Sequence, residues 1–284
     1  LIYEEKAVAV IGAMDGRSGH VAEQVITSAR GEAIFVTTWA SEETLTRIRI
    51  PWFFSVVPDD RDQASALAGE IFSARHIRNA AVWVEASFDA RAAAQSFVQA
   101  APPGVVTTFG AREPGSREEL IARAGRGEYG CVVMFTQPMA AVDLAGRLRS
   151  GGFRGQLAGP LWLASPEYLR GGDATEGTLL VAPARGRTRA IEEFNAIFLG
   201  AHGALPTPPA LYSHDAVRIL VEALRGAGAK SGDSLGRMLE ERSTWGLTGI
   251  VQFNERRGRD DAPTIARVEA GRLVALRGTA AADR

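Results

Sequence analysis

The chain has 284 residues, of which 46% are apolar, enough for one large core or two moderate ones. Its 32 basic and 33 acidic residues give a net charge of −1 and are mixed along the chain, which argues against a nucleic-acid partner. One cysteine excludes an intrachain disulfide, and no apolar run is long enough to cross a membrane. No signal-peptide pattern is present at Leu1, which we interpret as a mature, trimmed or intracellular chain.

The first predicted element is a short strand at residues 8–11, whose continuous apolar side chains indicate burial on both faces. The loop at residues 12–19 follows it and carries three groups with chemistry, namely Asp15, Arg17 and Ser18. In open parallel sheets, ligands bind beyond the carboxyl ends of the strands. This loop is therefore a candidate binding segment.

The helix expected next, at residues 19–30, places Val21, Val25 and Ala29 on its apolar face. Strands and helices then alternate through two similar series. The further strands expected in these series are at residues 33–36, 52–57, 80–84, 105–109, 130–135, 156–158 and 179–182. Such alternation predicts parallel sheets built from right-handed crossovers. After Arg185 the pattern becomes mainly helical, and the chain ends with a strand pair around Ala270.

Several short motifs, spread in order over almost the whole chain, are similar to those of one known family. They are LIYEEKAVAVIG at residues 1–12, FFSVVP at 53–58 with DQA at 62–64, LRSGGF at 148–153, ATEG at 174–177, HDAV at 214–217, and TG at 248–249 with FN at 253–254. On these motifs the chain resembles the type I periplasmic substrate-binding proteins of ABC transporters, in the group for branched-chain amino acids and amides. The motifs indicate the family and not the ligand.

The resemblance implies an α/β fold with two Rossmann-like lobes, parallel sheets and a ligand cleft between the lobes. The N-terminal lobe would comprise residues 1–78 and 186–261, and the C-terminal lobe residues 79–185 and 262–284. The family's first strand, helix and strand have no counterpart here. The strand at residues 7–11 is therefore expected to be a sheet edge, open to pairing by a partner chain or a missing segment.

On the first lobe, the resemblance implies ligand contacts from two loops that follow strands. The matching positions are Asp15, Gly16, Arg17, Trp39, Ala40 and Ser41. Asp15 stands where a neutral residue is usual in the family. Either Arg17 turns toward a ligand carboxylate, or Asp15 caps the next helix and Arg17 is solvated. Ser41 offers a hydroxyl group at a helix start that suits anions, and it can also serve as a cap.

On the second lobe, the implied contacts follow three strands. The matching positions are Phe88, Asp89, Gln137, Leu161 and Trp162. Amino-acid binders of the family hold the ligand ammonium with an acid after a Gly-Pro pair, but here Leu161 and Trp162 follow that pair. A buried ammonium without a countercharge is costly, so we expect a ligand with an apolar or aromatic body unless Asp15 or Asp89 takes over. The aromatic residues among these positions either line such a pocket or belong to core and surface.

Other functional classes fit the residues less well. Ser18 lacks the second glycine of a nucleophile elbow, and Ser213, His214 and Asp215 are consecutive, so their side chains diverge on a helix. The glycine spacing matches no nucleotide loop, and the histidines show no metal-ligand spacing. We therefore expect a non-enzymatic periplasmic receptor, without cofactor or metal, that delivers a small ligand to the membrane subunits of an ABC transporter. The alternatives are a sensory or regulatory binding module and, less favoured, a hydrolase.

Overall fold

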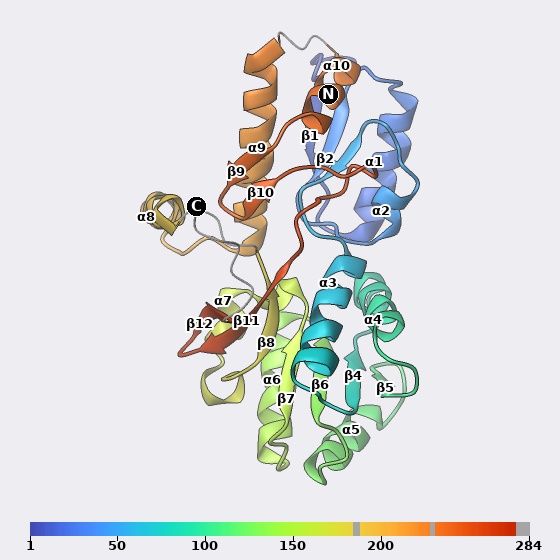
Figure 1. The fold of residues 1–284 in the computed structure, drawn as a ribbon, viewed down its shortest axis with the longest axis vertical. Coiled ribbons are helices and arrows are strands. Elements are labelled where there is room, and N and C mark those ends of the chain that lie inside the picture. Colours follow the sequence, from blue (N-terminus) through green and yellow to red (C-terminus); the bar gives the residue numbers. More distant parts are fainter. Residues whose placement is uncertain (184–187, 228–230, 277–284) are drawn as a thin grey trace. The chain divides into compact units, whose positions relative to one another are not determined.

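The computed structural model describes residues 1–183, 188–227 and 231–276 (Figure 1). The chain forms two compact units, each built from two segments. Unit 1 comprises Leu1–Asp59 and Ala184–Ala262, and unit 2 comprises Asp60–Pro183 and Pro263–Arg284. The expected α/β fold with mainly parallel sheets is confirmed.

Unit 1 is built on three parallel strands in the order β1-β2-β3 and a two-stranded antiparallel hairpin, β9–β10. Its elements are β1 (Ala9–Gly12), α1 (Gly16–Ser28), β2 (Ile34–Thr37), α2 (Thr44–Arg47), β3 (Phe53–Ser55), α8 (Thr188–His202), α9 (Pro208–Ala227), α10 (Gly232–Glu240), β9 (Thr244–Gly246) and β10 (Gly249–Val251). Strand β2 is buried at every position, since helices α1 and α10 pack against it and it is paired with a strand on each side.

The expected burial of the first strand is wrong, and on the expected apolar face of the first helix only Ala29 is buried. Strand β1 pairs only with β2 among the described strands, and none of its four residues is fully buried. The side chains of Val21 and Val25 on α1 are 61% and 55% exposed. Helix α1 instead turns Gly19 inward, where an added Cβ would lie 2.8 Å from Leu45 Cδ2. Glycine thus permits the close approach of α1 to α2, and that approach sets which face is buried.

A buried polar network joins α9 to the hairpin of unit 1. The Asp215 carboxylate accepts hydrogen bonds from the Leu247 and Thr248 N–H groups at 2.7 and 2.8 Å and from Thr248 Oγ1 at 2.6 Å. The Arg259 guanidinium donates to Thr248 Oγ1 at 2.6 Å and to the carbonyl oxygens of Val56 and Thr248 at 3.1 and 2.7 Å. Because both charged side chains are buried, this network fixes the hairpin against α9 and β3.

Unit 2 is built on a seven-stranded sheet in the order β12-β11-β8-β7-β6-β4-β5, in which β11 and β12 are antiparallel. Its elements are α3 (Asp60–Ala68), η1 (Gly69–Ala74), β4 (Ala80–Val84), α4 (Phe88–Ala100), β5 (Val106–Gly110), α5 (Ser116–Gly125), β6 (Cys131–Phe135), α6 (Pro138–Ser150), β7 (Gln156–Gly159), η2 (Leu161–Leu163), α7 (Pro166–Leu169), η3 (Gly172–Ala174), β8 (Leu179–Ala182), β11 (Thr264–Glu269) and β12 (Arg272–Ala275).

Strands β4 and β6 are buried at every position because helices cover both faces of the sheet. Phe97 of α4 packs on Phe135 of β6 from one side, with ring centroids 6.0 Å apart. Helices α5 and α6 pack on the other side in a core that includes Leu120, Met134 and Leu144. Because side chains on both faces of these strands are buried, the strands are continuous apolar runs in the sequence.

The order of the parallel strands places a topological switch point between β4 and β6. Strand β5 lies on one side of β4, while β6, β7 and β8 follow on the other. The connections that leave β4 and β6 therefore diverge, and the crevice beyond their carboxyl ends is the expected ligand position in such sheets.

The structure draws the first boundary between the units differently from the sequence analysis. Residues 60–78 were assigned to the first lobe, but the structure groups them with unit 2 because α3 packs on α4. The other boundary expected near residue 185 lies outside the described residues.

Candidate functional site

The first candidate loop of unit 1 begins α1. Asp15 is the N-cap residue, and its Oδ1 accepts a hydrogen bond from the Ser18 N–H at 2.7 Å. Hydrogen bonds from the Ser18 backbone and side chain hold the pKa of the Asp15 carboxyl below its usual value. Gly16 is buried at the first helical position, and Arg17 is exposed. Of the two interpretations of Asp15, the structure shows the helix cap.

The second candidate loop of unit 1 is tied to the first. The Ala40 N–H donates to the Ala13 carbonyl oxygen at 3.3 Å, and the Thr38 N–H donates to the Gly12 carbonyl oxygen at 3.3 Å. Ala13 adopts a left-handed backbone with φ of 60°, which turns the chain sharply after β1. The Ala40 N–H, one of the two backbone groups that the expected ligand contact at this residue could use, thus bonds within unit 1. Ser41 follows it and is partly buried.

Two residues of α9, Tyr212 and Ser213, contact the second loop, and neither was among the site positions expected from the sequence. The Trp39 and Tyr212 rings lie 6.3 Å apart, and the Ser213 Oγ donates to Thr38 Oγ1 at 3.3 Å. The hydroxyl group of Tyr212 is buried without a hydrogen-bond partner. Since Ser213 bonds to Thr38 and not to His214, the serine is not arranged for nucleophilic catalysis.

A histidine and two buried carboxylates connect α1 with the segment that leads into α2. His20 Nδ1 lies 2.6 Å from Glu23 Oε2, and His20 Nε2 lies 3.1 Å from Glu42 Oε2. Thr44 Oγ1 also donates to Glu42 Oε2, at 2.5 Å. Burial lowers the pKa of His20, but the hydrogen bonds and charges of Glu23 and Glu42 outweigh it and raise this pKa. Burial raises the pKa of Glu23.

We expect unit 1 to lose stability as the pH rises. His20 has a raised pKa in the folded chain, so its contribution is complete below its ordinary value of 6.5 and is lost as the pH rises through the folded value. Glu23 also has a raised pKa in the folded chain, so its contribution to stability is likewise lost as the pH rises above its ordinary pKa of 4.5. Urea unfolding at pH 5.5, 7 and 8.5 measures this trend. His20→Gln should flatten it and exposed His202→Gln should not; parallel profiles for all three proteins would contradict the assignment.

In unit 2, Glu85 bridges the switch point. Its Oε2 accepts hydrogen bonds from Thr136 Oγ1 at 3.0 Å and from the Gln137 N–H at 2.9 Å. Glu85 follows β4, and Thr136 follows β6, so one carboxylate links the ends of the two strands. Sequence reasoning missed Glu85; its signal is an acid directly after a buried strand.

The expected residues Phe88 and Asp89 form the start of α4. The Ser87 hydroxyl caps this helix by accepting a hydrogen bond from the Ala90 N–H at 3.3 Å. Phe88 and Asp89 are both partly buried. Gln137 is the N-cap residue of α6 and is exposed, without a side-chain capping bond. These three side chains therefore flank the switch point.

The last two expected residues, Leu161 and Trp162, each donate a hydrogen bond within unit 2. Leu161 is 2% exposed, and its N–H donates to Gln63 Oε1 at 3.1 Å. The Trp162 Nε1–H donates to the Thr136 carbonyl oxygen at 2.9 Å, and the indole packs edge-on against Phe135 with centroids 6.1 Å apart. Trp162 is thus fixed beside the end of β6, with its donor already satisfied.

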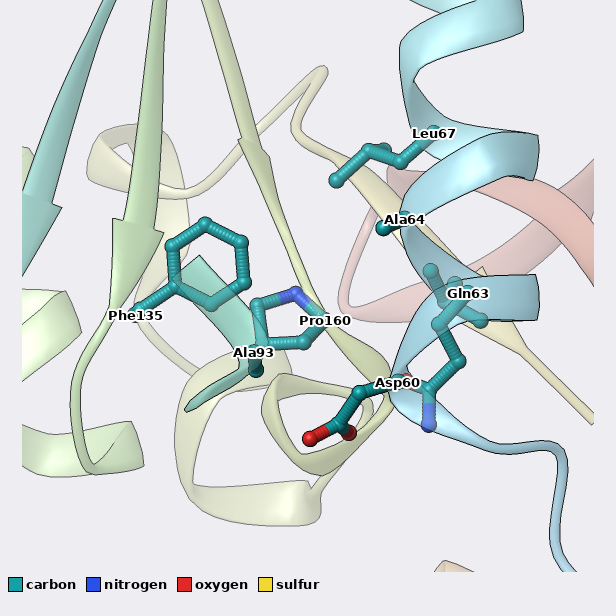
Figure 2. Close-up of a pocket in the computed structure, with 8 residues that line it drawn as sticks. Asp60, Gln63, Ala64, Leu67, Ala93, Phe135 and Pro160 are labelled. Carbon is teal, nitrogen blue, oxygen red and sulfur yellow. The ribbon is translucent and has the colours of Figure 1, made fainter. Parts of the chain in front are cut away.

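A small cavity lies behind this region of unit 2 (Figure 2). Asp60, Gln63, Ala64 and Leu67 of α3 form one wall, and Phe135 and Pro160 lie opposite. Its volume of about 10 Å³ has room for one water molecule and not for an organic ligand.

The structure thus gathers the expected residues into one group on each unit. Unit 1 brings together the loops that hold Asp15, Gly16, Arg17, Trp39, Ala40 and Ser41, and unit 2 brings Phe88, Asp89, Gln137, Leu161 and Trp162 to the carboxyl edge of its sheet. Among the described residues, no group of three or more histidine, cysteine or acidic side chains is arranged to hold a metal. In the described ranges no helix combines the length and apolar character needed to cross a bilayer.

Three solved structures that this chain resembles in fold are a leucine-binding protein and two solute-binding proteins of ABC transporters. A leucine-binding protein from Thermotoga maritima has a TM-score of 0.83 at 17% identity, with 97% of this chain and 80% of that chain covered. A solute-binding protein of an ABC transporter from R. palustris, in complex with benzoate, has a TM-score of 0.77 at 18% identity, with 97% and 78% covered. Another from Rhodopseudomonas palustris BisB5, in complex with 3,4-dihydroxybenzoic acid, has a TM-score of 0.80 at 17% identity, with 97% and 79% covered.

The comparison of the sequence with curated proteins finds no match. The family model described as periplasmic binding protein matches residues 1–272, nearly the whole chain. This agrees with the resemblance of the sequence motifs and with the two α/β units. The chain belongs to the periplasmic binding protein family.

Proposed function

We infer that this chain is an extracytoplasmic receptor that binds a small organic ligand with the carboxyl-edge loops of both units and delivers it to the membrane subunits of an ABC transporter. It acts by binding and not by catalysis. Ligand contacts from two units favour the state in which both sets are made, so the ligand itself shifts the population toward the bound arrangement.

The observation that supports this function best is the switch point of unit 2. Glu85, Gln137 and Phe88 lie there, at the carboxyl ends of β4 and β6, where doubly wound sheets bind ligands. Unit 1 offers a matching group, in which the loop around Trp39 is tied to the loop that begins α1. Neither group contains the serine and histidine arrangement of a hydrolase.

The ligand we propose has an aromatic or apolar body and a carboxylate, and is not a classical α-amino acid. Leu161 and Trp162 occupy the positions after Gly159 and Pro160 where an acid would hold an ammonium group. Glu85 is a carboxylate of this region, but its Oε2 already accepts two hydrogen bonds. Two structures of the same fold hold benzoate and a dihydroxybenzoic acid, which supports this ligand class.

A thermal-shift screen tests this proposal. Benzoate, hydroxylated benzoates, phenylacetate, their amides, leucine and valine are each added at about a hundredfold excess over a micromolar Kd. A true ligand should then stabilise the chain by about 3 kcal/mol. Stabilisation by the aromatic acids supports the proposal. Stabilisation by leucine or valine alone would contradict the proposed ligand class.

The free edge of β1 is a second interaction surface that we propose from the fold. Among described strands β1 has one neighbour, and its Ile11 is 37% exposed, while Val21 and Val25 of α1 are exposed by 61% and 55%. Unpaired strand edges and exposed apolar patches invite pairing. Residues 1–284 alone should therefore self-associate as concentration rises, measured by light scattering after size exclusion. Val21→Lys should weaken the association and Ile197→Lys, at an exposed residue of α8, should not; a monomer at every concentration would refute this expectation.

A further inference from the structure

Unit 2 contains an open hollow between α4 and the edge strand β5. Its volume is about 440 Å³. Its lining residues come from three places: the end of β4, successive turns of α4, and the end of β5 with the loop after it. They are Val84, Glu85, Ala86, Arg91, Ala94, Gln95, Val98, Thr108, Gly110, Ala111, Arg112 and Glu113. All of them belong to unit 2, on the side of the sheet where β5 has no further neighbour among the described strands (Figure 1).

The walls of this hollow are largely apolar. Ala94 is buried, and Val98, one turn further along α4, is 41% exposed although it is aliphatic. At Gly110 on β5, an added Cβ would meet nothing closer than Glu113 Oε1 at 3.8 Å. The missing side chain at Gly110 therefore leaves space that a ligand can fill.

Two arginines meet at one end of the hollow. Arg91 Nη1 and Arg112 Nη2 both donate to the carbonyl oxygen of Ala86, the latter at 3.4 Å. Within the described chain neither guanidinium forms an ion pair with a carboxylate, and their other N–H groups have no acceptor. Glu85 forms no ion pair with either arginine within the described chain, and its Oε2 accepts hydrogen bonds from Thr136 and Gln137. The remaining acid at the hollow, Glu113, is exposed.

We propose that this hollow is a second binding site, for small monocarboxylates with a flat apolar body. The carboxylate binds Arg91 and Arg112, since guanidinium groups match carboxylates in geometry and charge. The body lies over Ala94 and Val98 and fills the space at Gly110. This site goes beyond the proposed receptor function because it needs only residues 84–113 of unit 2.

Isothermal titration of the full chain with 2-naphthoate tests the site. Gly110→Val places a branched side chain in the hollow, at a backbone conformation that accepts one, and should weaken one binding event at least tenfold. The double variant Arg91→Gln with Arg112→Gln should weaken the same event at least tenfold. Glu113→Gln removes a like charge and should strengthen it about threefold. Arg78→Gln, at an exposed arginine of unit 2, is the matched control and should change nothing.

A variant of unit 1 distinguishes binding at the receptor site from binding at this second site. Trp39→Ala should weaken only the binding event that depends on unit 1. The second site is refuted if 2-naphthoate does not bind, or if every binding event survives both the Gly110→Val and the double arginine substitution. Loss of all binding in Trp39→Ala also refutes it, while leaving the receptor function in place.

Discussion

Arg259→Met should destabilise unit 1 by about 3–5 kcal/mol, the range for breaking a buried, hydrogen-bonded charge network. The Arg259 side chain is 3% exposed and donates to the carbonyl oxygens of Val56, Thr248 and Ile250. Methionine has similar length and no donor, so these buried oxygens would lose their partner at a cost of about 1–3 kcal/mol each. Thr248 Oγ1, which links Arg259 to Asp215, would also lose a donor.

Urea unfolding, followed by fluorescence, measures the loss. Arg256→Met is the matched control, because Arg256 is exposed three residues away in the same segment, and it should change stability by less than about 0.5 kcal/mol. Arg259→Lys keeps the charge but loses the planar guanidinium group with its several donors, so its free energy of unfolding should lie between those of Arg259→Met and Arg256→Met. Equal stabilities of Arg259→Met and Arg256→Met would show that the network contributes nothing.

Two glycines of α10 should respond to alanine with opposite signs. Gly232 begins the helix, and an added Cβ there would lie 2.4 Å from the backbone carbon of Ala33. Its N–H donates to the Glu32 carbonyl oxygen at 3.1 Å, so the helix cannot withdraw without breaking this bond. Gly232→Ala should therefore cost about 2–3 kcal/mol through overpacking against backbone.

Gly236, one turn later on the same helix, is the internal control. An added Cβ would meet the Phe54 ring at 3.6 Å and Ile34 Cγ2 at 3.7 Å, which are ordinary contacts. Alanine also favours helix over glycine by about 1 kcal/mol. Gly236→Ala should thus stabilise the chain by about 0.5–1 kcal/mol. Thermal and urea unfolding of both variants check the signs, and destabilisation by both would mean that α10 packs differently from the arrangement described above.

Strands could be predicted from the sequence where helices bury both faces of the sheet. The strands expected at residues 80–84 and 130–135 agree with β4 and β6 within one residue, because helices cover both of their faces. The first strand was placed within one residue of β1, but α1 begins at Gly16, three residues before the expected start, and the burial of both elements was predicted only in part. Burial there depends on which strand lies at the sheet edge, and strand order cannot be read from local apolar patterns.

Helix ends were less predictable. The sequence PTPP at residues 206–209 has the composition of a helix break, but α9 begins at Pro208, since proline fits the first turn of a helix, where its missing N–H is not needed. Asp15 shows the complementary case, because the pattern of a short acid before a helix allowed both a cap and a ligand contact, and the structure shows the cap.

The candidate site was predictable only as a set of loops. Glu85 was missed because its role depends on β4 and β6 being neighbours, a pairing between segments about fifty residues apart in the chain. Trp39 was placed in its loop, but its contact with Tyr212 of α9 joins residues 39 and 212. Such long-range pairs follow from the whole topology and not from spacing in the sequence.

The central claim is that loops of both units hold one ligand. Isothermal titration of the best ligand from the thermal-shift screen tests it most directly, with Trp39→Ala in unit 1, Phe88→Ala in unit 2, and Phe194→Ala on α8 as the matched aromatic control. The account predicts one binding event that is at least tenfold weaker in each of the first two variants and unchanged in the control. If no single binding event is weakened by both Trp39→Ala and Phe88→Ala, the account is contradicted.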